Sequence, residues 1–172
     1  MRAPITALAL SLGVLCAPTA AHADAGPKVR DSLWLPMGVN LGYAVNPDPL
    51  SNGFLLGPEV SLVYISKDFM WAGVYGDVLR DSGSKSTRMS VGAEAGAAIF
   101  GLDLGYVRQL SDPATDGFRA RFLLSLAAVH LYGGVGHLFA EPEGQTYGEA
   151  GVLLKFPLML VEAEPDDHHY RR

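Results

Sequence analysis

Residues 87–109 read TRMSVGAEAGAAIFGLDLGYVRQ, and this stretch contains the pattern that decides the fold. In its first half, apolar residues such as Met89 alternate with small or charged residues such as Gly92 and Glu94. Successive side chains of a β-strand point to opposite faces of a sheet, so alternation with a period of two predicts strands. A very short turn near residues 99–101 separates the two halves. The stretch therefore predicts two adjacent strands, each with an apolar face and a face of small and charged residues.

The same alternation recurs about eight times between Leu33 and Val161. The connections alternate in length, long then short, as expected for a chain that crosses a membrane repeatedly from a periplasmic N-terminus. The strands are close to the ~9–11 residues that a tilted membrane strand needs. The pattern predicts an all-β protein, an eight-stranded antiparallel up-and-down transmembrane β-barrel over residues 33–161. The expected strands are 33–45, 56–66, 69–79, 87–98, 100–109, 118–128, 131–139 and a last one that begins at Thr146.

The N-terminal segment, residues 1–23, has the features of a secretory signal peptide. Arg2 supplies a positive charge, an uncharged apolar run covers residues 5–16, and Ala21-His22-Ala23 is a small-x-small cleavage site. Cys16, the only cysteine, lies inside this segment, so the mature chain is expected to contain no disulfide and no cysteine ligand. Residues 24–32 are interpreted as a periplasmic lead, and residues 162–172 as a charged tail.

Composition narrows the class of protein further. The chain is 49% hydrophobic and only 18% charged, whereas a soluble surface usually needs about 25% charged residues or more. No stretch after residue 23 approaches the ~18 consecutive apolar residues of a membrane helix. The formal net charge of −5 argues against a nucleic-acid partner. The export signal, the lack of a spanning helix and the low content of charged residues together predict a barrel in the bacterial outer membrane.

A soluble periplasmic barrel of the lipocalin type is one alternative, because it shows the same alternation. In that fold the apolar face would be buried and the other face would meet water. Glycines such as Gly38, Gly92 and Gly105 would then stand where Lys, Glu and Thr are expected. The narrow interior of an eight-stranded barrel, in contrast, requires small residues between larger ones. The small face is therefore interpreted as the interior.

The last predicted strand contains a motif that points to a known family. Residues 149–156, EAGVLLKF, follow the order polar, x, Gly, x, x, apolar, x, apolar, with Gly151, Leu154 and Phe156 at the defining positions. The mature chain resembles the small eight-stranded outer-membrane barrels of the outer-membrane protein A, X and W kind. The resemblance implies recognition of this strand by the barrel-assembly machinery during biogenesis. It departs from the family in one respect, since sixteen residues follow Phe156.

Strand parity also assigns charged residues to the interior of the barrel. Isolated charges cost several kcal/mol when buried, so these residues are expected to form paired and hydrogen-bonded networks that plug the barrel. A proton or ion path is the alternative interpretation, although eight strands leave little space for a pore. The residues expected in the interior are Glu59, Asp77, Arg88, Glu94, Asp103, Arg119, Arg121, Glu149 and Lys155.

Aromatic residues gather near the predicted strand ends, where the aromatic girdles of outer-membrane barrels lie. Girdle positions are predicted for Trp34, Tyr43, Tyr64, Phe100, Phe118, Phe139 and Tyr147. Three basic residues near the outer rim, Arg80, Lys85 and Arg108, are candidates for contacts with lipopolysaccharide phosphates.

Function is expected to be structural or surface-interacting rather than enzymatic, in a monomer without cofactor or metal. The runner-up is a lipid-modifying enzyme of the lipid A deacylase or acyltransferase kind, which needs a Ser and a His at the outer leaflet. His137 lies near the outer end of its strand and Ser111 in an outer loop, but no His-x-Ser-Asn motif accompanies them.

Overall fold

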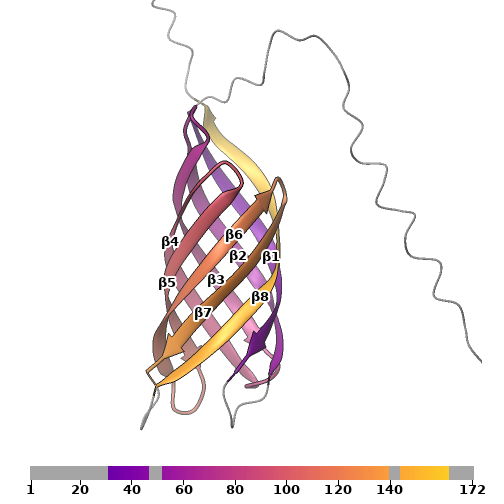
Figure 1. The fold of residues 1–172 in the computed structure, drawn as a ribbon, viewed down its shortest axis with the longest axis vertical. Coiled ribbons are helices and arrows are strands. Elements are labelled where there is room, and N and C mark those ends of the chain that lie inside the picture. Colours follow the sequence, from indigo (N-terminus) through magenta and orange to yellow (C-terminus); the bar gives the residue numbers. More distant parts are fainter. Residues whose placement is uncertain (1–30, 47–51, 140–143, 163–172) are drawn as a thin grey trace, which may run out of the picture.

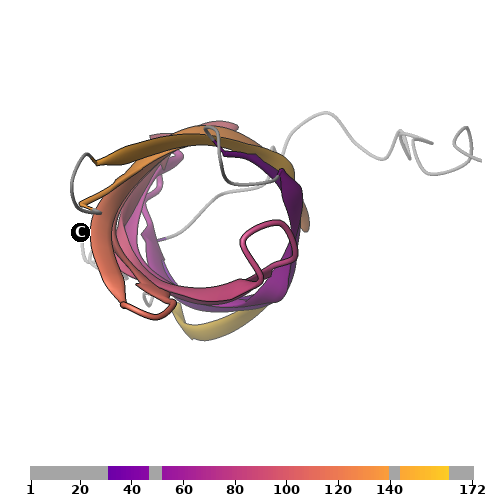
Figure 2. The same ribbon diagram turned by 90° about the horizontal axis from the view of Figure 1, so that it is seen from below.

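The computed structural model describes residues 31–46, 52–139 and 144–162, which form eight strands in a closed barrel. Each strand pairs antiparallel with the next, and β8 pairs with β1 to close the sheet (Figure 1). Seen along its axis, the sheet forms a complete ring (Figure 2). The prediction of an all-β, eight-stranded antiparallel up-and-down barrel is confirmed. The strands are β1 (Ser32–Val45), β2 (Gly53–Ile65), β3 (Met70–Asp81), β4 (Ser86–Ala97), β5 (Phe100–Leu110), β6 (Thr115–Leu126), β7 (Val129–Leu138) and β8 (Gln145–Glu162).

The observed strand bounds differ from the predicted ones where cross-strand pairing continues into turn-like sequence. β2 begins three residues earlier than predicted, at Gly53, because Gly53 pairs with Ala44 of β1. Ser32 and Glu162 pair with each other, so both belong to the barrel and not to the lead and the tail. The predicted signal peptide 1–23, the remainder of the lead and residues 163–172 lie outside the described residues.

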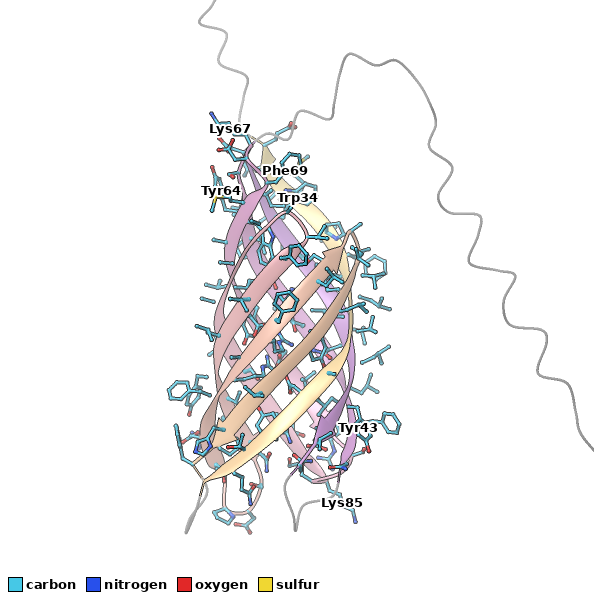
Figure 3. All side chains as sticks on the ribbon, viewed as in Figure 1. Trp34, Tyr43, Tyr64, Lys67, Phe69 and Lys85 are labelled. Atoms are coloured by element: carbon cyan, nitrogen blue, oxygen red, sulfur yellow. The ribbon has the colours of Figure 1, made fainter. Side chains whose placement is uncertain are left out.

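The two ends of the barrel differ in their connections. The short-turn end carries the turns 66–69, 98–99 and 127–128, and the long-loop end carries the connections 46–52, 82–85, 111–114 and 139–144. Trp34, Tyr64, Lys67 and Phe69 lie at the short-turn end, and Tyr43 and Lys85 at the opposite end (Figure 3). Successive connections lie at opposite ends of the barrel because neighbouring strands run in opposite directions.

The two faces of the sheet have opposite chemistry. Every strand exposes large apolar side chains on the outside, among them Leu41, Leu104 and Val135. The inside buries polar and charged side chains from every strand except β7, with small apolar clusters near both ends. A water-soluble barrel has the reverse arrangement. Among the described residues, no helix is long and apolar enough to span a membrane.

Interior glycines make room for large aromatic rings. A methyl group added at Gly42 or Gly151 would overlap the hydroxyl of Tyr132. The same relation joins Tyr75 to Gly105, Tyr147 to Gly136, and Trp71 to Gly96 and Gly101. The glycines of the face predicted from the sequence therefore leave the space that the inward-pointing aromatic rings occupy.

Candidate functional site: the charged interior

The interior charge network, defined by the charged side chains buried inside the barrel, is centred on Arg121 of β6. Its Nε donates to Asp103 Oδ2 at 2.6 Å, and its Nη2 donates to Glu59 Oε2 at 3.1 Å. The guanidinium carbon also lies 5.1 Å from the ring centroids of both Tyr75 and Tyr132. Two carboxylates and two aromatic faces therefore surround one buried cation, the pairing that a buried guanidinium requires.

Arg119, two residues earlier on the same inward face of β6, forms a second cluster of charges. Its Nη2 lies 2.5 Å from Asp77 Oδ2, and its Nε lies 3.6 Å from Glu149 Oε1. Asp77 also lies 3.8 Å from Nη1 of Arg121. The two arginines are thus joined through a shared carboxylate, so the charges of β2, β3, β5, β6 and β8 form one continuous network.

Lys155 of β8 extends the network towards the short-turn end. Its Nζ donates to Ser61 Oγ at 2.8 Å and lies 2.9 Å from Glu59 Oε1. It also contacts Glu94 Oε2 at 3.3 Å. Glu59 therefore bridges Lys155 and Arg121, two cations on different strands.

Arg88 of β4 occupies the long-loop end of the interior. Its Nη2 donates to Asp81 Oδ2 at 2.5 Å and to Asn46 Oδ1 at 3.0 Å, and its Nε donates to Gln109 at 3.3 Å. Its guanidinium carbon lies 4.1 Å from the ring centroid of Tyr147. Asp81 was not predicted in the interior because it was placed in a loop. It has the same parity as Asp77, so a strand prediction longer by two residues would have included it.

All nine charged residues expected in the interior lie there, and Asp81 joins them. Across the described residues, six interior carboxylates face four interior cations. The arrangement crosslinks distant strands by paired charges and fills the barrel with large side chains. Each interior cation contacts at least one carboxylate, so charged pairs link strands across the interior.

Five of the seven predicted girdle residues point outward. Tyr43 packs edge-on against Phe54, and Phe118 packs against Phe139. The outward residues are Tyr43, Tyr64, Phe100, Phe118 and Phe139.

The predictions for Tyr147 and Trp34 are wrong. Tyr147 is 2% exposed and stacks on Arg88 inside the barrel. Trp34 pairs with the inward residue Val63 and donates from Nε1 to Ser32 Oγ at 2.8 Å. Both residues were assigned by their position near a strand end, whereas their parity along the strand decides the face.

The predicted assembly motif lies in the middle of β8. Gly151 faces inward, whereas Leu154 and Phe156 are exposed on the outside. β8 continues to Glu162, and its register with β7 ends at the pair Val129–Leu154. After Leu154, the described residues of β8 are in register with β1 and no longer with β7.

His137 and Ser111, the residues that an enzyme interpretation would use, each have another hydrogen-bond partner. His137 Nδ1 bonds to Thr146 Oγ1 at 2.9 Å, and the Ser111 hydroxyl donates to the carbonyl of Pro113. Within the described ranges, no group of three His, Cys, Asp or Glu side chains is arranged to hold a metal ion.

The fold and its interior define a class, a small closed β-barrel with a charged, internally paired core and an apolar exterior. Comparison with protein-family models, with curated proteins and with solved structures finds no match to this chain.

Proposed function

We propose that this protein is an outer-membrane β-barrel with a structural or surface-interaction role. The observation that carries the proposal is the inversion of the two faces: charged side chains are buried inside, and every strand exposes large apolar side chains outside. Burial of this outer face in lipid would stabilise the protein by about 25 cal/mol for each Å² of apolar surface removed from water. A soluble monomer rarely exposes so large an apolar surface. A closed sheet also satisfies the backbone hydrogen bonds that lipid cannot.

The proposed orientation places the long-loop end outside the cell and the short-turn end in the periplasm. Three exposed basic residues lie towards the long-loop end: Arg80 on β3, Lys85 in the connection between β3 and β4, and Arg108 on β5. Phosphates of lipopolysaccharide are the proposed ligands of these groups, since guanidinium and ammonium groups bind phosphate by charge-assisted hydrogen bonds. The barrel-assembly machinery is the proposed partner of β8 during biogenesis, and the folded protein is proposed to be a monomer.

A substitution at the centre of the outer face tests the membrane proposal. Leu104 lies in the middle of β5 and is 66% exposed. Leu104→Arg is expected to destabilise a membrane-inserted barrel by about 2–4 kcal/mol, because an arginine side chain would meet the bilayer midplane. Urea unfolding in lipid vesicles measures the effect, with Leu104→Ala as the matched control.

Localisation gives the second arm of this test. The protein is expected in the outer-membrane fraction, with gel migration in detergent that changes on heating. In a soluble barrel Leu104→Arg would be a surface substitution with an effect within about 0.5 kcal/mol. That result, together with recovery of the protein wholly in the soluble periplasm, would refute the proposal.

The paired interior charges support a plug rather than a channel. Purified protein in planar bilayers is expected to give no steady conductance, because ion-paired side chains occupy the narrow interior. A steady current that disappears in Glu94→Ala or Arg121→Ala would show an ion path through the network, and would contradict the plug.

A further inference from the structure

The short-turn end of the barrel contains a cavity of about 810 Å³ that the proposed function does not use. Its walls are mainly apolar and come from every strand except β5 and from the turns at this end, with the indoles of Trp34 and Trp71 among them. Trp34 lies close to the rim of this end (Figure 3). The volume is within the range of sites that bind drug-sized molecules, which are commonly apolar with a few polar groups.

The polar groups of the cavity are unequal in what they can still bind. Lys155 lines the cavity, but its ammonium already donates hydrogen bonds to Ser61 and Glu94 and forms an ion pair with Glu59. Glu94 also lines the cavity, is 3% exposed and has one carboxylate oxygen, Oε1, that accepts no hydrogen bond within the described structure. His130 and Ser125, which also line the cavity, bond to each other. The cavity therefore has an unused carboxylate oxygen at Glu94, whereas its one ammonium is already paired with two carboxylates.

The nearby charges favour a positively charged ligand. Two carboxylates, Glu59 and Glu94, surround the single ammonium of Lys155. A ligand with an anionic head group would be repelled by both carboxylates and would have to displace one from Lys155. An ammonium group would instead gain an ion pair with Glu94, and indole faces attract cations as well.

We propose that this cavity binds a hydrophobic amine, with its apolar body between the walls that carry Trp34 and Trp71 and its ammonium group directed towards Glu94. The ligand class follows from the apolar walls, the unpartnered Glu94 oxygen and the two carboxylates that already pair with Lys155. The site goes beyond the proposed structural role, and it requires no particular location of the barrel.

The protein contains its own reporters for this site. Trp34 and Trp71 are the only two tryptophans of the chain, and both line the cavity. Quenching of intrinsic fluorescence by a bromine atom on a ligand therefore reports occupancy. The probes are a long-chain primary amine, fatty acid and alcohol of equal length, each brominated at the terminal carbon. They are titrated into the barrel without its predicted signal peptide, residues 1–23, in detergent-free vesicles of zwitterionic phosphatidylcholine.

The amine is expected to quench saturably, with a half-maximal concentration at least about ten-fold below that of the acid, since a charge-assisted hydrogen bond exceeds the ~1.4 kcal/mol that a ten-fold ratio represents. Glu94→Gln is expected to reduce this preference to about three-fold or less. Glu149→Gln replaces an interior carboxylate that does not line the cavity, and serves as the matched control that keeps the preference.

Two further variants separate cavity binding from partition into lipid. Ala128 is an exposed turn residue on the cavity wall, so Ala128→Phe is expected to narrow the cavity without loss of folding and to weaken quenching by all probes. A barrel with Trp34→Phe, Trp71→Phe and Phe100→Trp reports on the outer surface and is expected to quench without saturation. Equal half-maximal concentrations for amine and acid, or an amine preference that survives Glu94→Gln, would overturn the proposal.

Discussion

Arg121→Met is expected to destabilise the folded barrel by about 3–5 kcal/mol, the largest effect of any single charge removal in the interior. Arg121 pairs directly with Asp103 and Glu59 and lies between two tyrosine rings. Methionine has similar volume, so the barrel stays filled while the two carboxylates lose their shared cation. Urea unfolding in lipid vesicles, followed by the heat-dependent change in gel migration, measures the loss.

Arg108→Met provides the matched control for this prediction. Arg108 is exposed and lies 3.7 Å from Asp116, a surface ion pair that typically contributes ~0–1 kcal/mol. Adding Asp103→Asn to Arg121→Met is expected to recover part of the lost stability, because it removes one of the carboxylates left without its partner. Equal destabilisation by Arg108→Met and Arg121→Met would show that the interior pairing does not support the barrel.

Gly57→Ala is expected to cost about 1–3 kcal/mol through a single added methyl group. Gly57 faces inward in β2, directly before Pro58, where the pairing between β2 and β3 is interrupted. A Cβ at this position would overlap the backbone carbonyl oxygen of Val78 in β3. A backbone atom of the neighbouring strand cannot move away as a flexible side chain can, so the sheet itself must distort.

Gly133→Ala is the matched control, because a Cβ at Gly133 of β7 meets no heavy atom within 4 Å. Alanine lowers the entropy of the unfolded chain, so this substitution is expected to be neutral or to stabilise by up to about 1 kcal/mol. Both variants are measured by urea unfolding in the same vesicles. A loss of stability in Gly133→Ala as large as that in Gly57→Ala would assign the effect to general intolerance of alanine in these strands.

Much of the interior could be predicted because parity is a local property of a strand. Glu94 and Arg121 share their face with glycine or with other charged residues in the alternation, and both are buried. The errors arose where position along the strand was used instead of parity, as for Tyr147 and Trp34. Asp81 was missed because the end of β3 depends on backbone pairing with Ser86, which the residue pattern alone does not indicate.

The cavity at the short-turn end could not be predicted from alternation. It depends on the closed sheet, which brings residues of seven strands and of the turns 98–99 and 127–128 to the same end of the barrel. The resulting space brings Trp34, Trp71 and Glu94 into one site from three strands. The alternation predicts a girdle position for Trp34 and an interior charge for Glu94, and it does not indicate that the two line one cavity.

The sequence by itself determined the eight strands, their antiparallel order and the chemistry of their two faces, because a period of two is set by each strand's own geometry. Only the tertiary structure decided which carboxylate meets which cation and which glycine admits which ring. Those contacts depend on the stagger of the closed sheet. This stagger places Glu59 beside Arg121, 62 residues away, and Ser61 beside Lys155, 94 residues away.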